Sequence, residues 1–394
     1  MSLRLPIYLD NHSTTQVDPR VVDAMLPYFS QHYGNAASKH HQFGWNAEAA
    51  VEKARKQLAE LIGSDPDEIV FTSGATESIN LALKGIAEGY RARGNHIITV
   101  ATEHRAVLDT CRRLKLYGFN VTLLPVDRFG MVSQDELHRA ITPATILVSV
   151  MFANNEVGTI APVAGLGAIC RERGIVFHTD ATQAVGKIPV NVHDLNVDLL
   201  SFSAHKMYGP KGVGALYIRK SKPPLGLVAQ TDGGGHEKAV RSGTLNVPAI
   251  VGFGEAAAIC SRGMREESHR IASMRDRLVD GIASELEDVW INGHPEMRLP
   301  NNANICFPGM NADSLIMEMK EIAVSTGSAC SSAIPEPSHV LKAIGLNDED
   351  TRASIRFGIG RFNTEEEIDH TIAKVVETVR VARKTSPTYH LAHT

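Results

Sequence analysis

Short apolar segments alternate with helix-like segments through the first half of the chain, and this order restricts the fold more than any other feature. Seven apolar segments predict strands, at residues 69–72, 96–100, 121–126, 146–152, 175–179, 197–203 and 214–219. Helical patterns lie between several of them, at 76–90, 104–117 and 163–173, and an earlier amphipathic helix over 47–62 ends at Gly63. Nearly continuous apolar strands joined by helices indicate an α/β fold with a mostly parallel sheet that is covered on both faces.

The character of the sequence changes near Ser261, where long charged helical stretches begin. A short strand is predicted at 302–307 and a closing helix at about 364–380. No internal repeat or low-complexity segment interrupts either region. The second region therefore predicts an additional, smaller α+β domain.

The overall composition argues against several classes of partner. The formal net charge is −4, and the sequence has no basic stripe that would favour a nucleic acid or a membrane surface. No apolar run approaches the roughly 20 residues that span a bilayer, and the N-terminus lacks a secretory signal. The five cysteines are an odd number without a CxxC pair, which argues against a disulfide framework or a cysteine zinc site. We therefore expect a protein of the reducing cytoplasm.

Polar side chains follow five of the predicted strands, at the point where each strand ends. The groups are Thr72 to Thr76, Thr102 to His104, Asn154 to Glu156, Asp180, and Ala204 to Lys206. In open α/β sheets, ligands bind at the carboxyl ends of the strands. Polar loops occur in any protein, but five such groups that include an imidazole, a carboxylate and an amine predict a functional site.

Two of these groups allow two interpretations each. Residues 73–76 (SGAT) open a helix, whose backbone N–H groups and dipole suit a phosphate, although Ser and Thr are also ordinary helix caps. Asp180 directly follows a strand. It serves there either as the cap of the next helix or as a buried carboxylate that keeps a pyridine nitrogen protonated.

Lys206 carries the most specific signal, because it ends an apolar strand in the segment SFSAHKMYGPKG and stands beside His205. Lysines usually lie on the surface, and Lys211 is expected to be such a residue. At the end of a buried strand, desolvation lowers the pKa of a lysine from about 10.4 and makes its amine a better nucleophile. We therefore predict that Lys206 carries pyridoxal phosphate.

Several motifs together resemble those of the cysteine desulfurases, a group of class V (fold type I) pyridoxal-phosphate enzymes. They occur in the expected order from Ile7 to about Ile372: YLDNHSTTQVDP, FTSGATESINLALKG, TEHRAVL, ANNEVG, HTDATQAVGK, SFSAHKMYGPKGVGALY, RSGTLN and STGSACSSA. The sequence is similar to the housekeeping and nitrogen-fixation type, which has a long catalytic-cysteine loop. The resemblance implies a fold type I architecture with a large, mostly parallel seven-stranded sheet domain over 15–261. A smaller α+β domain, formed by 1–14 and 262–394, carries the cysteine loop.

The resemblance also implies a role for each residue that matches a family motif. Pyridoxal 5′-phosphate is expected on Lys206, with Asp180 at the pyridine nitrogen, Gln183 near the ring hydroxyl and His104 stacked on the ring to move protons. Further cofactor contacts, mainly to the phosphate, are expected from Ala75, Thr76, Asn155, Ser203, His205 and, across the interface of a homodimer, Thr244. Asn155 and Arg356 are expected to hold the substrate carboxylate, a task that suits a bidentate guanidinium.

Cys330 matches the catalytic cysteine of the family. It lies in the segment STGSACSS, whose composition is typical of a mobile surface loop. A free thiol is only a few per cent thiolate at neutral pH, so it needs activation, for which His104 is the candidate. The implied reaction converts L-cysteine to L-alanine and leaves a persulfide on Cys330. Its sulfur then passes to a transient acceptor, a scaffold or carrier protein, for iron–sulfur cluster assembly or related thiolation.

Several alternatives remain open at this stage. Selenocysteine lyase activity is compatible with the same pocket, whereas a class V aminotransferase needs no loop cysteine, so Cys330 argues against it. A non-catalytic fold relative is disfavoured because a lysine, an imidazole, a carboxylate and a loop cysteine occur together. The adjacent His40 and His41, at a predicted helix start, indicate solvation or packing rather than a metal site. Relatives of the housekeeping type carry a longer C-terminal tail that contacts the scaffold protein; HLAHT stands in its place here, which leaves the acceptor open.

Overall fold

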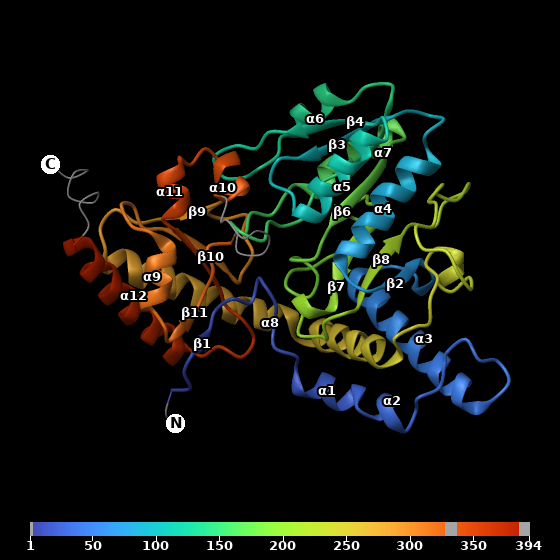
Figure 1. Ribbon diagram of the computed structural model, residues 1–394, viewed down its shortest axis with the longest axis horizontal. Helices are drawn as coiled ribbons and strands as arrows, with labels where there is room; N and C mark the ends of the chain where they lie inside the picture. Colours follow the sequence, from blue (N-terminus) through green and yellow to red (C-terminus); the bar gives the residue numbers. More distant parts are fainter. Residues whose placement is uncertain (1–2, 328–336, 386–394) are drawn as a thin grey trace.

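A computed structural model describes residues 3–327 and 337–385. The chain forms two regions that lie side by side, and the long helix α8 (Val247–Glu285) runs along both of them (Figure 1). The larger region holds most of the first 260 residues, and the smaller one combines the N-terminal strand with the C-terminal part of the chain.

The larger region is built on a seven-stranded sheet with the strand order β2-β8-β7-β6-β5-β3-β4. The strands are β2 (Ile69–Thr72), β3 (His96–Val100), β4 (Asn120–Leu124), β5 (Thr145–Ser149), β6 (Val176–Asp180), β7 (Leu199–Ser203) and β8 (Gly214–Ile218). Pairs among β3 to β7 are parallel, and β8 is antiparallel to both of its neighbours, β2 and β7. The predicted mostly parallel sheet is therefore confirmed, with β8 as its reversed strand.

Helices cover both faces of the sheet, because successive side chains of a strand point to opposite faces. Their bounds are α1 (Pro19–Met25), α2 (Pro27–Ser30), α3 (Gln42–Ile62), α4 (Ala75–Gly89), α5 (Arg105–Leu116), α6 (Gln134–Ala140) and α7 (Val163–Arg173). Helices α4 and α5 pack on one face, in a core that includes Ile97 and Leu147. Helices α3, α6, α7 and the first part of α8 pack on the other face, around Ile98 and Val148.

Helix α3 shows how single residues set the ends of an element. It begins at Gln42, five residues before the predicted start, because Nδ1 of His41 accepts a hydrogen bond from the backbone N–H of Gly44 at 3.1 Å and caps the helix. It ends at Gly63, whose left-handed conformation (φ 68°) suits a glycine. The second residue of the histidine pair therefore has a structural role as a helix cap.

Helix α8 links the two regions. Its first half contributes Ile250 and Phe253 to the core on the larger sheet, and its second half contributes Ile271 and Leu278 to the core of the smaller region. The sequence indicated long charged helices from about Ser261, but a single helix of 39 residues already begins at Val247. The predicted division between residues 261 and 262 falls within this helix and stays a prediction.

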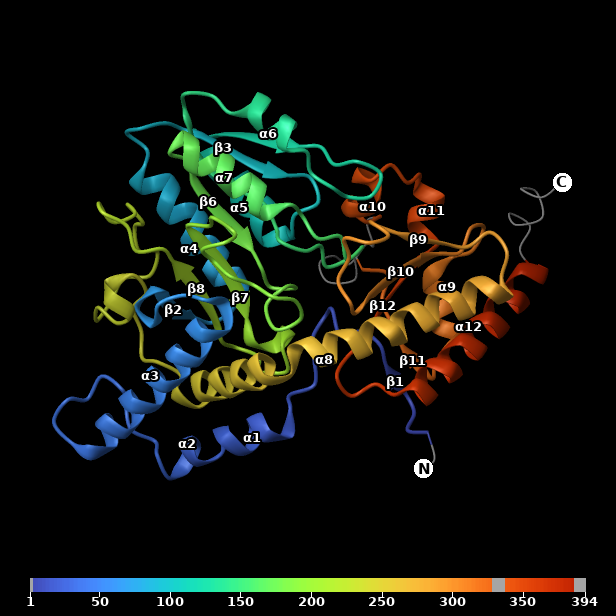
Figure 2. The same ribbon diagram turned by 180° about the vertical axis from the view of Figure 1, so that it is seen from behind.

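The smaller region contains an antiparallel three-stranded sheet and a short parallel pair (Figure 2). The sheet is formed by β9 (Trp290–Asn292), β10 (Asn302–Cys306) and β12 (Ser354–Gly358), and the pair by β1 (Ile7–Tyr8) and β11 (Ile322–Ala323). The helices are α9 (Ala312–Glu318), α10 (His339–Ala343), α11 (Asp348–Arg352) and α12 (Glu365–Thr385). Figure 2 shows α12 alongside the second half of α8. Within the described part of the chain, no helix is long and apolar enough to cross a membrane.

Candidate active site

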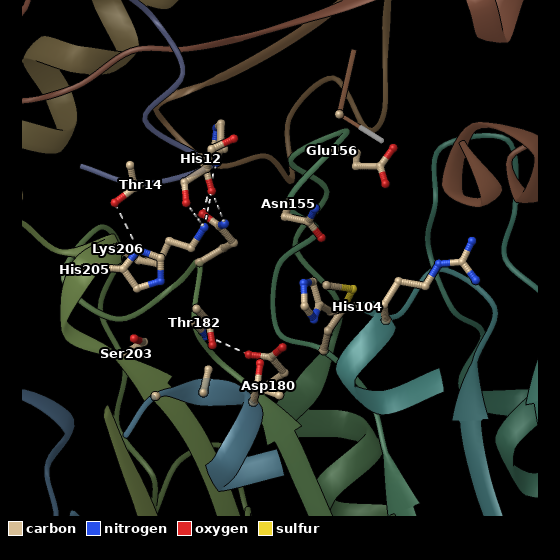
Figure 3. A pocket seen from close by; sticks show the side chains of 18 of the residues that line it. His12, Thr14, His104, Asn155, Glu156, Asp180, Thr182, Ser203, His205 and Lys206 are labelled. Atoms are coloured by element: carbon tan, nitrogen blue, oxygen red, sulfur yellow. Dashed lines mark hydrogen bonds between the residues drawn. The ribbon is translucent and has the colours of Figure 1, made fainter. Parts of the chain in front are cut away.

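A cavity of about 680 Å³ lies where the carboxyl ends of the parallel strands meet the smaller region (Figure 3). Ten residues predicted for the site line it: Ala75, Thr76, His104, Asn155, Asp180, Gln183, Ser203, His205, Lys206 and Arg356. The strand ends bring most of them together, because the carboxyl ends of parallel strands meet at one edge of a sheet. Thr244 is exposed and does not line the cavity within one chain. Cys330 lies outside the described residues.

Lys206 projects into the cavity from a short 3₁₀ turn (Ala204–Lys206) that directly follows β7. The side chain is partly buried, and its Nζ donates hydrogen bonds to the backbone carbonyls of His12 and Ser13, the latter at 2.7 Å. The N-terminal segment after β1 therefore holds the amine in place. This segment belongs to the YLDNHSTT motif, but the sequence did not single out His12 as a site residue.

Asp180 lies at the end of β6, and only 5 % of its surface is exposed. One carboxylate oxygen accepts a hydrogen bond from the backbone N–H of Thr182 at 3.0 Å. No helix lies between β6 and β7 in the described chain, so the interpretation of Asp180 as a helix cap is wrong. The carboxylate lines the cavity, as the other interpretation requires. Its negative charge favours the protonated form of His104 and so opposes the larger effect of burial, which lowers the pKa of that imidazole.

His104 faces Asp180 across the cavity and caps α5 (Figure 3). Its Nδ1 accepts a hydrogen bond from the backbone N–H of Ala106 at 3.1 Å. The pKa of His104 is lowered overall, because desolvation by the surrounding protein outweighs the opposing effect of Asp180, although part of the residue remains open to the cavity. An acceptor at Nδ1 and a lowered pKa favour the neutral imidazole with its proton on Nε2.

Gln183 is held by two basic side chains that the sequence did not assign to the site. Its Oε1 accepts hydrogen bonds from Nδ1 of His12 at 3.0 Å and from Nζ of Lys187 at 2.8 Å. Its Nε2 donates to the backbone carbonyl of His12 at 3.1 Å. Burial holds the pKa of His12 well below its usual range and, together with the charges of Lys206 and Arg356, lowers the pKa of Lys187 to about 7.

The start of α4, at Ala75 and Thr76, lines the same cavity as Lys206. No side chain in the described part of the chain caps this helix, so the backbone N–H groups of its first turn are available to bind an anion. The turn sits close against β8: a Cβ added to Gly214 would lie 2.6 Å from the Cα of Gly74, so a glycine is required there. Ser203 and His205 line the same side of the cavity.

Arg356 reaches the cavity from β12 of the smaller region and is 3 % exposed. Its Nη1 donates to the backbone carbonyl of Asn155 at 2.9 Å, and its Nη2 donates to Oδ1 of Asp10 and to Oγ of Ser13, both at 2.9 Å. Its Nε is buried without a hydrogen-bond partner among the described residues. The guanidinium is thus held in a fixed orientation by Nη1 and Nη2, and Nε is its donor without a partner among the described residues.

The donor groups on this cavity fit pyridoxal phosphate. A helix N-terminus suits the phosphate, an amine suits the aldehyde, and a buried carboxylate suits the ring nitrogen. The volume of about 680 Å³ lies within the range of about 300–1,000 Å³ that is common for ligand pockets. Glu156 and His339 also line the cavity. The sequence named Glu156 only among the polar strand ends, and His339 had no signal beyond the motif that precedes it.

Comparisons with known proteins show which family the chain belongs to. The pattern of the class V aminotransferase family matches residues 7–371. A cysteine desulfurase IscS of Anaeromyxobacter dehalogenans is 54 % identical over 389 residues, which cover 99 % of this chain and 96 % of the relative. A human cysteine desulfurase is 50 % identical over 386 residues, covering 98 % of this chain and 84 % of the relative.

Two solved structures show the same similarity in three dimensions. A NifS-like protein superposes with a TM-score of 0.89 at 40 % identity, covering 96 % of this chain and all of that chain. A structure described as SspA in complex with cysteine superposes with a TM-score of 0.80 at 35 % identity, covering 91 % of this chain and all of that chain. The chain therefore belongs to the class V aminotransferase family and, within it, to the cysteine desulfurases.

Proposed function

We propose that this protein is a pyridoxal-phosphate-dependent cysteine desulfurase that converts L-cysteine to L-alanine and supplies the sulfur for iron–sulfur cluster assembly or related thiolation. One observation carries the proposal: a single cavity joins the amine of Lys206 and the carboxylate of Asp180 to a guanidinium, that of Arg356, from the other region of the fold. An amino acid whose carboxylate is held by Arg356 would present its α-carbon to the amine.

The residues of the larger region hold the cofactor in this proposal. When bound, pyridoxal phosphate supplies a protonated ring that takes up the electron pair released when the bond from the α-carbon to hydrogen breaks. Lys206 anchors the group, and the start of α4 with Thr76, Ser203 and His205 binds the phosphate. Asp180 would keep the ring nitrogen protonated, and Gln183 would bind the ring hydroxyl.

Proton transfer is assigned to Lys206 and His104. After its release by the incoming amino acid, the amine of Lys206 removes the proton from the α-carbon. The neutral imidazole of His104, fixed by its bond to the backbone of Ala106, would face the bound cofactor and relay protons through Nε2. Asn155 and Arg356 keep the substrate carboxylate still during these steps.

Sulfur transfer is assigned to Cys330. Its thiolate attacks the sulfur of the bound cysteine, so that a sulfur–sulfur bond forms while the bond from Cβ to sulfur breaks. The electron pair from that bond stays with the substrate, which takes up protons and leaves as L-alanine. The products are one L-alanine and one Cys330 persulfide for each L-cysteine, with no external oxidant or reductant in this step. A transient acceptor protein then takes the outer sulfur.

We also propose a homodimer that works in the cytoplasm. Large exposed apolar side chains gather between the end of α1 and the start of α3, namely Leu26, Phe29, Tyr33, Phe43 and Trp45, which are 49–65 % exposed. A concentration of this kind supports an interface between protein chains. In the dimer, Thr244 of one chain is expected to complete the phosphate site of the other.

Incubation of the purified protein with L-cysteine and a thiol reductant tests the proposal. The expected products are sulfide and L-alanine in equal amounts, and without reductant a persulfide on Cys330 by mass spectrometry. Cys330→Ala is expected to abolish both, whereas Cys170→Ala, which removes a buried thiol on α7, is expected to retain both. Release of an oxo acid instead of alanine, or sulfide formation by Cys330→Ala at the wild-type rate, would refute the proposal.

A further inference from the structure

The carboxylate of Glu156 contacts the chain on the C-terminal side of the segment that carries Cys330. Glu156 follows β5, is 4 % exposed and lines the cavity. Its Oε2 accepts a hydrogen bond from Oγ of Ser338 at 2.5 Å. The same Oγ accepts a bond from the backbone N–H of Leu341 at 3.1 Å and caps α10. The first described residues after residue 336 are therefore fastened to Glu156.

The chain on the N-terminal side of that segment comes close to the same carboxylate. Gly327, the last described residue before it, has φ 86°, and a Cβ added there would lie 3.1 Å from Oε2 of Glu156. The backbone N–H of Gly327 donates to Oγ of Ser325 at 3.0 Å. Ser325 in turn pairs with Arg356 through a backbone hydrogen bond of 2.7 Å. The described residues on both sides of the segment thus lie near Glu156, and Ser338 is hydrogen-bonded to it.

The backbone of Glu156 is itself fixed from two sides. Its N–H donates to Oδ1 of Asn154 at 2.8 Å. Its carbonyl accepts hydrogen bonds from Nδ2 of Asn302 at 3.1 Å and Nδ2 of Asn304 at 3.2 Å, both on β10 of the smaller region. The side chain therefore projects from a point that is tied to both regions of the fold. A side chain fixed in this way can hold Ser338 at a defined distance from the cavity.

A further contact places the residues after the Cys330 segment beside His104, the proposed proton-transfer group. His339, next to Ser338, lies within hydrogen-bond distance of the backbone carbonyl of Glu103 at 2.9 Å, and since a carbonyl only accepts, Nε2 is the donor. Glu103 directly precedes His104 in the chain. The C-terminal flank of the Cys330 segment is thus attached to Glu103, next to His104, and Ser325 on its N-terminal flank pairs with Arg356 itself.

We propose that Glu156 is a positioning residue for sulfur transfer, whose carboxylate holds the C-terminal flank of the Cys330 segment, at Ser338, beside the cavity. It acts at the step in which Cys330 takes the sulfur, and not in the binding of the cofactor or of L-cysteine. The inference rests on the proposed function. Glu156→Ala removes the acceptor of the bond from Ser338, whereas Glu156→Gln keeps an oxygen that accepts this bond and is the conservative variant.

The test compares two measurements on the holoenzymes of both variants and of Glu136→Ala, a control on the distant helix α6. The first is the affinity for L-cysteine, from the change in visible absorption of the cofactor. The second is the single-turnover rate of persulfide formation on Cys330, from mass spectrometry. For Glu156→Ala we expect an unchanged affinity and a persulfide rate at least about tenfold lower, which is the size of one lost charge-assisted hydrogen bond. Glu156→Gln is expected to stay within about threefold of wild type, as is the control.

A second variant keeps the inference testable if Glu156→Ala does not fold. Ser338→Ala removes the other partner of the bond and is expected to slow persulfide formation in the same way, without additivity in the double variant. A wild-type persulfide rate in either single variant would overturn the inference, and so would an equal loss of affinity and rate. Failure of the wild-type protein itself to form a persulfide would instead overturn the proposed function, and with it this inference.

Discussion

At the scale of single residues, the most unusual group is Lys187, a lysine that is buried without an acidic partner among the described residues. It is 6 % exposed, and its Nζ donates to Oε1 of Gln183. Burial, reinforced by Lys206 and Arg356, lowers its pKa from 10.5 to about 7. Between these two values the unfolded chain binds a proton that the folded chain does not, so the free energy of unfolding rises with pH, by up to about 1.4 kcal/mol per pH unit.

Replacement of this lysine by an uncharged side chain of similar length therefore has a predictable effect. Lys187→Met is expected to melt at a higher temperature than wild type near neutral pH, because the folded wild type bears the cost of a buried charge there. The difference is expected to shrink as the pH rises from about 7 to about 9, since the lysine loses its proton in the folded state. Thermal unfolding across this range measures it, with the exposed Lys53→Met as control. Melting curves that respond to pH in the same way for both Lys187→Met and wild type would contradict the assignment.

Residues at strand ends could be predicted from the sequence, and residues that act through them could not. Lys206, Asp180 and His104 each follow an apolar strand directly, so their position along the chain already places them at one edge of the sheet. His12 and Lys187 have no such position. His12 meets Gln183 only because a segment 171 residues earlier in the chain returns to the sheet edge, which no local pattern indicates.

At the scale of elements, a buried ion pair covers part of the edge strand β2 of the large sheet. Arg55 on α3 and Glu237 form two hydrogen bonds, of 2.7 and 2.9 Å, with both side chains almost fully buried. The pair also binds the free edge of β2, because Arg55 donates to the carbonyl of Ile69 at 2.7 Å and Glu237 accepts from the N–H of Phe71 at 2.8 Å. It thus occupies backbone groups that would otherwise be open to another strand.

Removal of one member of this pair is expected to be costly. Arg55→Met leaves a buried carboxylate without its partner, and we expect the free energy of unfolding to fall by about 3–5 kcal/mol. The double variant Arg55→Met, Glu237→Leu is expected to be less destabilised than Arg55→Met, although not fully restored, because Ile69 and Phe71 still lose their partners. Urea unfolding of the three proteins measures both effects. A double variant that is no more stable than Arg55→Met would show that the charge left behind is not the main cost.

The length and burial of an element decided how well the sequence predicted it. The seven strands of the large sheet were all found from their apolar residues, and all except the edge strand β4 are almost fully buried. The mostly parallel arrangement was predicted, but the reversal of β8 was not, since an apolar run is the same in either orientation. The two-residue strands β1 and β11 pair across more than 300 residues and are too short to carry a pattern of their own.

At the scale of the whole molecule, the cavity exists because two separately packed cores meet at it. Residues from the larger core supply the lysine, carboxylate and imidazole, and β12 of the smaller region supplies Arg356. The sequence predicted both regions and most of the site. It did not predict that α8 continues without a break from one core to the other. The apolar residues of the first half of α8 pack on the larger core and those of the more charged second half pack on the smaller core, so the two halves have different patterns.

In the proposed homodimer, the apolar surface between the end of α1 and the start of α3 forms the interface. Phe29 and Tyr33 are 63 % and 65 % exposed in the single chain, and an interface would remove both from water. The double variant Phe29→Glu, Tyr33→Glu places two charges there, and a buried charge without a partner costs several kcal/mol. We therefore expect it to be monomeric by light scattering at concentrations where the wild type is dimeric.

The same variant is expected to bind the cofactor more weakly, because Thr244 of the partner chain would no longer complete the phosphate site. Equilibrium titration with pyridoxal phosphate measures this loss. Met317→Glu, a change at an apolar side chain on α9 that is 72 % exposed, is the matched control and is expected to stay dimeric with unchanged affinity. A monomer that retains the wild-type affinity would separate the two ideas: the surface would be the interface, but the cofactor site would be complete within one chain.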